Sequence, residues 1–341
     1  MCQLTRKALI TGITGMVGSH LADYLIDNTD WDIYGMYRWR SPLDNINNLI
    51  EKANKKDRVH LVYGDLRDTT SIRNVVKDVR PDYVFHLAAQ SFPKTSFTSP
   101  EDTLDTNIQG TTRLLESIKE YKNDAIVHVC SSSEVFGRVS REKLPINEEC
   151  TFHPASPYAI SKVGTDLIGR FYAEAYHMMV MTTRMFTHTG PRRGDVFAES
   201  TFAKQIAMIE QGIIDPVVKV GNLDSLRTIA DVRDAVRAYH MLVTINPIKG
   251  SYYNIGGSES LTIREVLDFL ISKSTFKQKI DIIVEKERIR EIDADLQVPD
   301  TSKFTSHTGW KPEIGYKTTL TDLLDYWRDK VTNSNSGFLT R

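Results

Sequence analysis

The sequence predicts an α/β protein built around a doubly wound parallel sheet, followed by a smaller α+β lobe. Three observations lead to this prediction. Short runs rich in β-branched residues alternate with amphipathic stretches through the first half of the chain. A glycine-rich turn separates the first run from the first amphipathic stretch. The alternation stops after Arg184, where proline, glycine and threonine become frequent.

Short β-branched and aromatic runs predict the strands. These runs are Ala8 to Thr11, Ile33 to Tyr37, Val59 to Tyr63, Tyr83 to Leu87, Ile126 to Cys130 and Val180 to Arg184. The stretches with helical spacing of apolar residues are Val17 to Leu25, Ser71 to Val79, Thr103 to Tyr121 and Tyr158 to Tyr176. Strands joined through helices run parallel, so we expect ligands at the carboxyl ends of the strands.

The chain after Arg184 predicts a smaller α+β lobe, over residues 185–332, that binds mainly the substrate. Its clearest helices are Phe202 to Gln211, Val232 to Leu242, Ile263 to Ser272 and Leu320 to Lys330. The pattern leaves open whether some of its segments return to the main sheet. Residues 1–184 then form the unit that holds the cofactor and the catalytic residues. The polar end, residues 333–341, is expected to be disordered.

The composition is that of an ordinary globular protein, with 40% hydrophobic and 26% charged residues. Lys and Arg total 43 against 44 acidic residues, so a broadly basic, nucleic-acid-binding surface is not expected. No apolar run is long enough to span a membrane, and no signal-peptide pattern follows Met1. The three cysteines lack disulfide or metal-site spacing, which favours the cytoplasm. The histidines lack ligand spacing, so no metal is predicted.

The turn after the first predicted strand contains three glycines, Gly12, Gly15 and Gly18. In a dinucleotide-binding turn the first permits a tight bend, and the second lets the backbone approach a pyrophosphate. The third lets the helix pack closely against the strand. Glycines also gather at other strand-to-helix turns, so the spacing alone does not decide. Its place in the first βα unit favours a Rossmann-type cofactor site.

The end of the second predicted strand indicates which cofactor binds. An acidic residue there would accept a hydrogen bond from the ribose 2′-hydroxyl of NAD, but this chain has Arg38. A guanidinium pairs with a 2′-phosphate, so the sequence predicts NADP, against the alternative of a solvated basic loop. Asp65 is expected to accept from the adenine amino group. The predicted cofactor-binding residues are Gly12, Gly15, Met16, Val17, Gly18, Arg38, Asp65, Leu66, Leu87, Ala88 and Ala89, with Tyr158 and Lys162.

The predicted catalytic residues are Ser132, Glu134, Tyr158 and Lys162. Tyr158 and Lys162 are four positions apart and share a helix face. This helix follows the fifth strand, whose end carries a serine cluster, and the two segments are expected to converge beside the nicotinamide. Tyrosine is a poor base at neutral pH, but a nearby ammonium and a positive nicotinamide ring favour the phenolate. Ser132 is expected to hold the same substrate oxygen, and Glu134 to remove a proton beside a newly formed ketone. Alternatively, the serines cap the strand end and Glu134 is an ordinary solvated side chain.

At these residues the sequence resembles the extended short-chain dehydrogenase/reductase superfamily, over about residues 5–332. Within the superfamily it looks like the GDP-mannose 4,6-dehydratase group, including dehydratases that act on GDP-manno-heptose. The stretches that carry the resemblance are Gly12 to Gly18, Arg38, Asp65 with Leu66, Leu87 to Ser91, Ser131 to Gly137, Tyr158 to Lys162, Gly190 to Gly194, Val220 to Arg227 and Arg290 to Asp300.

The resemblance implies a nucleotide-sugar site beside the cofactor. The substrate-binding residues that it implies are Gln90, Ser91, Ser132, Arg192, Asn222, Arg227, Arg290 and Asp293. Asn222, Arg227 and Arg290 would contact the nucleoside diphosphate, and Asp293 the ribose. Arg192 and its neighbour Arg193 occupy a loop that reaches NADP or the nucleotide in relatives.

The resemblance also implies a reaction, the NADP-dependent 4,6-dehydration of a GDP-manno-configured sugar. Tyr158 would take the O4 proton, Glu134 would remove H5, and water would leave from C6. The alternatives are a 4-keto reductase or epimerase of a nucleotide sugar, which the chain after Phe202 resembles equally, and a non-catalytic NADP-binding regulator. Hexose and heptose substrates stay open, because the loops around Phe92 to Thr95 and Thr187 to Arg193 depart from the hexose pattern.

For assembly, the resemblance implies a homodimer or a homotetramer. The predicted helices Thr103 to Tyr121 and Tyr158 to Tyr176 resemble the pair that forms a four-helix dimer interface in the superfamily. In the dehydratase group the loop corresponding to Arg38 to Asn45 reaches a neighbouring subunit and gives tetramers. The alternative is a solvated loop on a simple dimer.

Overall fold

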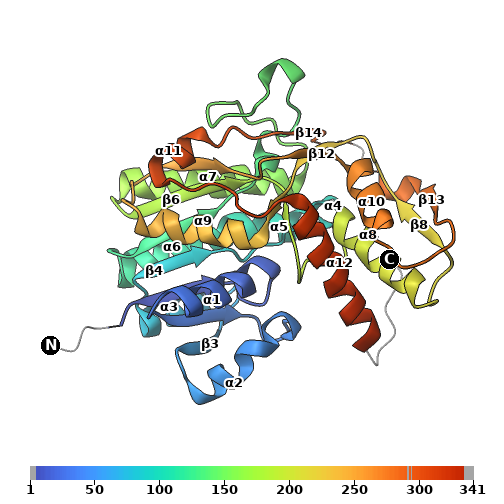
Figure 1. The fold of residues 1–341 in the computed structure, drawn as a ribbon. Coiled ribbons are helices and arrows are strands. Elements are labelled where there is room, and N and C mark those ends of the chain that lie inside the picture. Colours follow the sequence, from blue (N-terminus) through green and yellow to red (C-terminus); the bar gives the residue numbers. More distant parts are fainter. Residues whose placement is uncertain (1–4, 290–291, 293, 334–341) are drawn as a thin grey trace.

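Seven parallel strands form the centre of the protein, in the order β11-β6-β5-β4-β1-β2-β3 (Figure 1). This computed structural model describes residues 5–289, 292 and 294–333. The strands of the sheet are β1 (Lys7–Thr11), β2 (Asp32–Tyr37), β3 (Val59–Tyr63), β4 (Tyr83–His86), β5 (Ile126–Cys130), β6 (Met179–Met185) and β11 (Tyr252–Ile255). Every neighbouring pair runs parallel, so the predicted fold class is confirmed.

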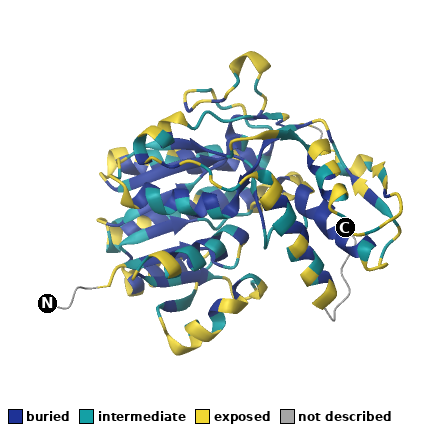
Figure 2. Cartoon of the chain, viewed as in Figure 1, coloured by how far each residue is buried: buried dark blue, intermediate teal, exposed yellow. Residues whose placement is uncertain are grey.

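Helices cover both faces of this sheet (Figure 2). One face is covered by α1 (Met16–Asn28) and α9 (Val232–Thr244), and the other by α3 (Thr69–Val79), α6 (Gly110–Tyr121) and α7 (Pro157–Ala175). Strands buried on both sides must be apolar on both sides. In β1, Ala8 and Ile10 pack into the first layer, whereas Leu9 packs into the second.

A second apolar core lies beside the sheet. It is formed by α8 (Ala198–Glu210), β8 (Val217–Val220), α10 (Ile263–Ser272), β13 (Asp281–Val284) and α12 (Tyr316–Asn333). The two halves of the chain are interleaved, because β11 and α9 follow Arg184 in sequence but belong to the main sheet and its helical layer. The division into residues 1–184, 185–332 and 333–341 therefore stays a prediction. Asn333 ends α12, and residues 334–341 lie outside the described residues.

The remaining elements are short. They are η1 (Asp44–Ile46), α2 (Asn47–Lys55), α4 (Pro93–Thr98), α5 (Pro100–Leu104), η2 (Asp105–Gln109), η3 (Ser133–Val135), η4 (Arg141–Lys143), β7 (His188–Thr189), β9 (Leu226–Thr228), β10 (Ala230–Asp231), β12 (Ser260–Thr262), η5 (Lys286–Arg288), β14 (Leu296–Gln297) and α11 (Ser302–Thr308). Strand β9 lies between β12 and β14, β7 pairs with β10, and β8 pairs with β13.

One predicted helix contains a π turn. The stretch from Thr103 to Tyr121 consists of the end of α5, the π turn η2, and α6. Side chains enter the backbone hydrogen-bonding pattern there, because the hydroxyls of Thr111 and Thr165 both donate to the carbonyl of Asn107, at 2.6 and 3.3 Å. Every residue from Thr103 to Tyr121 is helical, so the predicted helix is confirmed, and the π turn within it is the feature that the sequence pattern did not reveal.

Candidate active site

The glycine turn between β1 and α1 brings backbone close to backbone. Gly12 has a φ of +77°, a left-handed conformation that glycine adopts without strain, and a Cβ there would lie 3.0 Å from the Cα of Ala88. A Cβ on Gly18 would lie 2.3 Å from the Gly12 carbonyl oxygen. The first turn of α1 has no acidic residue and no side-chain cap. Its backbone N–H groups are therefore available to an anion.

A cavity of about 610 Å³ lies over the carboxyl ends of β1, β4, β5 and β6. Its floor includes Gly12, Gly15, Met16, Val17 and Gly18 from the turn and the start of α1. Leu87 and Ala89, just beyond β4, border it as well. The edge of the sheet expected to hold ligands is thus the edge that carries the cavity.

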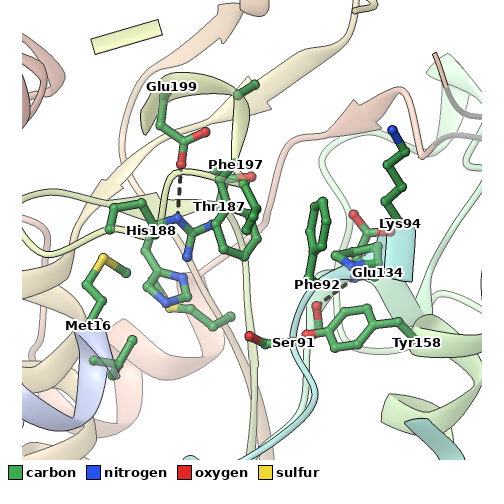
Figure 3. A pocket seen from close by; sticks show the side chains of 18 of the residues that line it. Met16, Ser91, Phe92, Lys94, Glu134, Tyr158, Thr187, His188, Phe197 and Glu199 are labelled. Atoms are coloured by element: carbon green, nitrogen blue, oxygen red, sulfur yellow. Dashed lines mark hydrogen bonds and ion pairs between the residues drawn. The ribbon is translucent and has the colours of Figure 1, made fainter. Parts of the chain in front are cut away.

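One side of the cavity, here called the catalytic wall, consists of Ser132, Glu134, Tyr158 and Lys162. Ser132 is the second residue after β5 and caps η3, where its Oγ accepts from the Glu134 backbone N–H at 3.2 Å. Tyr158 stands in the first turn of α7, and Figure 3 shows it next to Glu134. The four residues predicted to be catalytic are therefore together in the structure.

The electrostatics of Tyr158 differ from the prediction. Burial raises the pKa of Tyr158 above its ordinary value, while a hydrogen bond with the Ser132 hydroxyl and the positive charge of Arg193 lower it. Lys162 was expected to favour the phenolate, but its Nζ donates to the Cys130 carbonyl at 2.7 Å and lies 6.0 Å from the centre of the Tyr158 ring. Burial also lowers the pKa of Lys162. Arg193 is thus the cation that acts on the phenol here.

The opposite side of the cavity, here called the loop wall, runs from Thr187 to Glu199 and includes Arg193. The Nε–H of Arg193 donates to Glu199 at 3.2 Å, and its guanidinium carbon lies 3.4 Å from the centre of the Phe197 ring. His188 also borders the cavity, and burial lowers its pKa to about 4, with Arg193 adding to the effect. Figure 3 shows His188, Phe197 and Glu199 on this side.

The sequence pointed to the loops around Phe92 to Thr95 and Thr187 to Arg193, but it did not name Phe92, His188 or Glu199 as site residues. The ring of Phe92 meets that of Phe197, with 5.9 Å between the ring centres. Aromatic residues within loops that join buried strands were the available signal, because an exposed aromatic ring gains little free energy in a loop.

Four predicted cofactor residues do not border the cavity. Arg38 follows β2 and is exposed, and no described residue pairs with its guanidinium. The Asp65 carboxylate accepts from the backbone N–H of Arg67 at 3.0 Å, within its own turn. Leu66 is buried in the core of the second helical layer, and Ala88 packs against Gly12. Their predicted roles stay predictions.

The predicted substrate residues also include some that border the cavity and some that do not. Ser91, Ser132, Arg192, Asn222 and Arg227 border the cavity. Gln90 does not, because its side-chain amide bonds both the N–H and the carbonyl of Phe92, at 2.9 and 3.2 Å. Arg290 and Asp293 lie outside the described residues.

Two further observations concern the described part of the chain. None of its helices is both long enough and apolar enough to cross a membrane. Within residues 5–289, 292 and 294–333, no three His, Cys, Asp or Glu side chains gather as metal ligands would.

The fold and the placement of Ser132, Tyr158 and Lys162 are those of an extended short-chain dehydrogenase/reductase. Within that class the chain belongs to the GDP-mannose 4,6 dehydratase family, whose sequence model matches residues 9–323. The family expected from the sequence is therefore confirmed.

Curated relatives include both dehydratases and a reductase. A protein from Yersinia enterocolitica named GDP-mannose 4,6-dehydratase is 32% identical over 345 residues, covering 91% of this chain and 90% of the relative. A protein from Pseudomonas aeruginosa named GDP-6-deoxy-D-mannose reductase is 30% identical over 329 residues, covering 96% and 99%.

Solved structures share the fold. The structure of RMD from Pseudomonas aeruginosa complexed with NADPH has a TM-score of 0.78 and 28% identity, covering 96% of this chain and all of the other. A dTDP-glucose 4,6-dehydratase from Streptomyces venezuelae has a TM-score of 0.84 at 23% identity, which speaks for the fold alone.

Proposed function

We propose that this protein catalyses the NADP-dependent 4,6-dehydration of a GDP-manno-configured sugar, giving the 4-keto-6-deoxy sugar. The observation that carries the proposal is the catalytic wall. An acid/base pair for a hydroxyl, Ser132 with Tyr158, stands beside a second base, Glu134, over a dinucleotide turn. A simple alcohol oxidation needs only the first pair, whereas an elimination needs both.

The glycine turn fits a dinucleotide. The close approaches at Gly12 and Gly18 leave no room for side chains, and the uncapped N-terminus of α1 would bind the diphosphate. Arg38, exposed at the end of β2, would pair with the 2′-phosphate that distinguishes NADP from NAD. Bound NADP would supply a two-electron oxidation by accepting a hydride from C4 of the sugar. The same hydride would be returned to C6 in the same turnover.

Tyr158 would move the proton of the sugar O4. Its hydroxyl is hydrogen-bonded to Ser132, so both groups converge on one substrate oxygen. Burial raises the pKa of Tyr158, which makes the phenol a stronger base once it is deprotonated. The positive charge of Arg193 opposes that rise. Lys162 would orient the cofactor ribose and the end of β5, through its bond to Cys130.

Glu134 would remove the proton at C5. A ketone at C4 acidifies that proton, and its loss expels water from C6. The Glu134 side chain is half-buried, and no described residue forms a hydrogen bond or an ion pair with its carboxylate. Its oxygens are therefore not engaged by another side chain of the described residues and could accept a substrate proton.

The phosphates of a nucleotide sugar would bind at the other end of the cavity. Asn222 and Arg227 border that end, and an Nη of Arg227 donates to the carbonyl of Ala294. The Asn222 amide donates to Ser225 at 3.1 Å. These contacts hold the two side chains in place, which lowers the entropy cost of binding. Roles for Gln90, Arg290 and Asp293 stay predictions from the family resemblance.

A 4-keto reductase is the second candidate, because the Pseudomonas aeruginosa relative with that name matches nearly the whole chain. Mass spectrometry of products from GDP-mannose and from GDP-manno-heptose, each with catalytic NADP, separates the two. A dehydratase gives a product lighter by one water without consuming reductant. A reductase leaves both substrates unchanged and consumes stoichiometric NADPH with the 4-keto sugar. The same experiment identifies the hexose or heptose substrate, and no turnover in any arm would favour a regulator.

For assembly, we propose a homodimer through α6 and α7. The outer side of α7 exposes Ile160, Leu167 and Phe171, at 49%, 47% and 54%. Their helical spacing puts them near one another on a surface that a partner would cover. Trp39, 78% exposed in the loop after β2, would extend the contact to a tetramer. Light scattering checks this, because a mass near 38.8 kDa would exclude both forms.

We also propose a cytoplasmic location. Cys130 and Cys150, the cysteines within the described residues, are both unpaired. Free thiols are maintained in reducing compartments. Cell fractionation of the tagged protein tests this location directly.

A further inference from the structure

Two consecutive arginines in the loop wall point to different partners. Arg193 is held by Glu199 and Phe197 within the cavity. Arg192 also borders the cavity, but its Nη1 donates to Oδ2 of Asp23 on α1, at 2.7 Å. The pair Asp23–Arg192 joins segments that are far apart in the chain, the cofactor helix and the loop wall.

Asp23 is a junction of three elements. Its Oδ2 accepts from Arg192, and its Oδ1 accepts from the side-chain amide of Asn48 on α2, at 2.8 Å. His20 lies three residues earlier on the same helix face, and its Nε2–H donates to the Pro191 carbonyl at 3.1 Å. Burial and the charge of Arg192 lower the pKa of His20 to about 4, so it stays neutral at physiological pH. We call His20, Asp23, Pro191 and Arg192 the α1 latch.

The loop that the latch holds has an unusual backbone. Arg192 has a φ of +68°, in the left-handed region that residues with a Cβ rarely adopt. Such a conformation costs free energy and persists where the surroundings fix it. The two latch contacts are on Pro191 and Arg192, so they fix the backbone immediately before Arg193.

The guanidinium of Arg193 borders the cavity with N–H groups that a ligand could bind. Among the described residues, only the Nε–H of its guanidinium has a hydrogen-bond partner, which leaves the terminal amino groups for the cavity. The position of the Arg193 side chain in the cavity depends on the backbone conformation of Arg192, the residue before it. A change of backbone at Arg192 would therefore move the guanidinium of Arg193.

We propose that Asp23 and Arg192 are positioning residues, and that their ion pair sets the geometry in which Arg193 meets a phosphate-bearing ligand. Neither side chain needs to contact that ligand. The inference rests on the proposed function only in taking the ligands to be NADP and a GDP-sugar. Arg192, predicted from the sequence to bind substrate, would then act through its neighbour.

The test measures binding directly, on the full-length protein, by calorimetry with NADP and separately with GDP. Asp23→Asn and Arg192→Gln should each weaken at least one ligand about tenfold, the scale of coupling between neighbouring residues. The double variant should bind no more weakly than either single variant. Asp27→Asn is the matched control, because Asp27 is exposed one turn along the same helix. Its dissociation constants should equal those of the wild type.

Two further variants separate positioning from general stability. Asp23→Glu, which keeps the carboxylate, should restore binding to within about twofold of the wild type. In an Arg193→Met background, Asp23→Asn should have no further effect, because the latch acts only through Arg193. An equal loss in that background, or wild-type binding by Asp23→Asn, overturns the proposal. Because binding is measured without turnover, these results are independent of which reaction the enzyme catalyses.

Discussion

The catalytic wall and the loop wall enclose one cavity but are built in opposite ways. Ser132 is the second residue after β5, and Tyr158 and Lys162 stand in the first two turns of α7, so the neighbouring regular structure fixes their positions. The loop wall is mostly irregular, because its only regular structure is the two-residue strand β7 and the first two residues of α8. Its side chains are held by ion pairs to other elements, such as Arg192 with Asp23. The positions of residues fixed by regular structure can be predicted from a sequence. The positions of residues fixed by ion pairs to distant segments cannot.

The largest effect is expected at the catalytic wall. Tyr158→Phe removes the hydroxyl that would move the O4 proton and should lower turnover by about 10²-fold or more. Binding of NADP, measured by calorimetry, should stay close to the wild type, since the phenyl ring keeps the packing. Activity near the wild type would remove Tyr158 from the mechanism.

Glu134→Gln should separate oxidation from elimination. We expect about a 10²-fold loss of dehydration, because the amide is not a base. Oxidation at C4 should continue, and transfer of deuterium from a C4-deuterated substrate to NADP measures it. Normal dehydration by this variant would show that the second base lies elsewhere, for example in the loop wall.

The sheet beneath the catalytic wall predicts a pH dependence of stability. Burial lowers the pKa values of His86 and His128 from 6.5 to about 3, with Lys162 adding to both shifts and His86 to that of His128. Below pH 6.5 the unfolded chain therefore binds protons that the folded chain does not. Stability should be full above about pH 6.5 and fall as the pH drops toward 3. The loss approaches about 1.4 kcal/mol per pH unit for each histidine.

Urea unfolding between pH 7.5 and 5 measures this slope. His128→Gln should remove the contribution of one histidine to the slope of unfolding free energy against pH, because glutamine does not titrate. His153→Gln is the control, since His153 is exposed. A stability independent of pH over this range would contradict the neutral, buried state of both rings.

The smallest effect is expected at Arg38, which belongs to neither wall. Arg38→Asp would repel the 2′-phosphate of NADP and accept from the 2′-hydroxyl of NAD. The ratio of the two dissociation constants should change by about tenfold to a hundredfold. An unchanged ratio would mean that the Arg38 side chain stays in solvent when the cofactor is bound.

Most of the fold was predictable because the main sheet follows simple periodicity. The strands from β1 to β6 are apolar runs at predictable spacing, and the glycine turn has its own signature. β11 was missed because Tyr252 to Ile255 includes the polar Asn254, whose backbone and side chain bond to Glu148 and Ile146. That pairing compensates for the polar residue, but only the folded chain reveals it.

The site residues also differ in how far the sequence predicts them. Ser132, Glu134, Tyr158 and Lys162 were placed correctly in one cavity, because strand ends and helix starts have fixed positions relative to a parallel sheet. The electrostatics of Tyr158 could not be foreseen, since they depend on Arg193, which arrives from the loop wall. Gln90 was expected to face substrate, yet a local turn with Phe92 occupies its amide.

Strand β11 has a consequence for synthesis on the ribosome. It completes the sheet beside β6, but it is made only after the chain has passed through α8, β8 and α9. Until then β6 presents an unpaired edge, and exposed edges recruit strands of other chains. Nascent or truncated chains that end before Tyr252 should therefore aggregate through β6. Once β11 pairs with β6, that edge is covered and can no longer pair with incomplete chains.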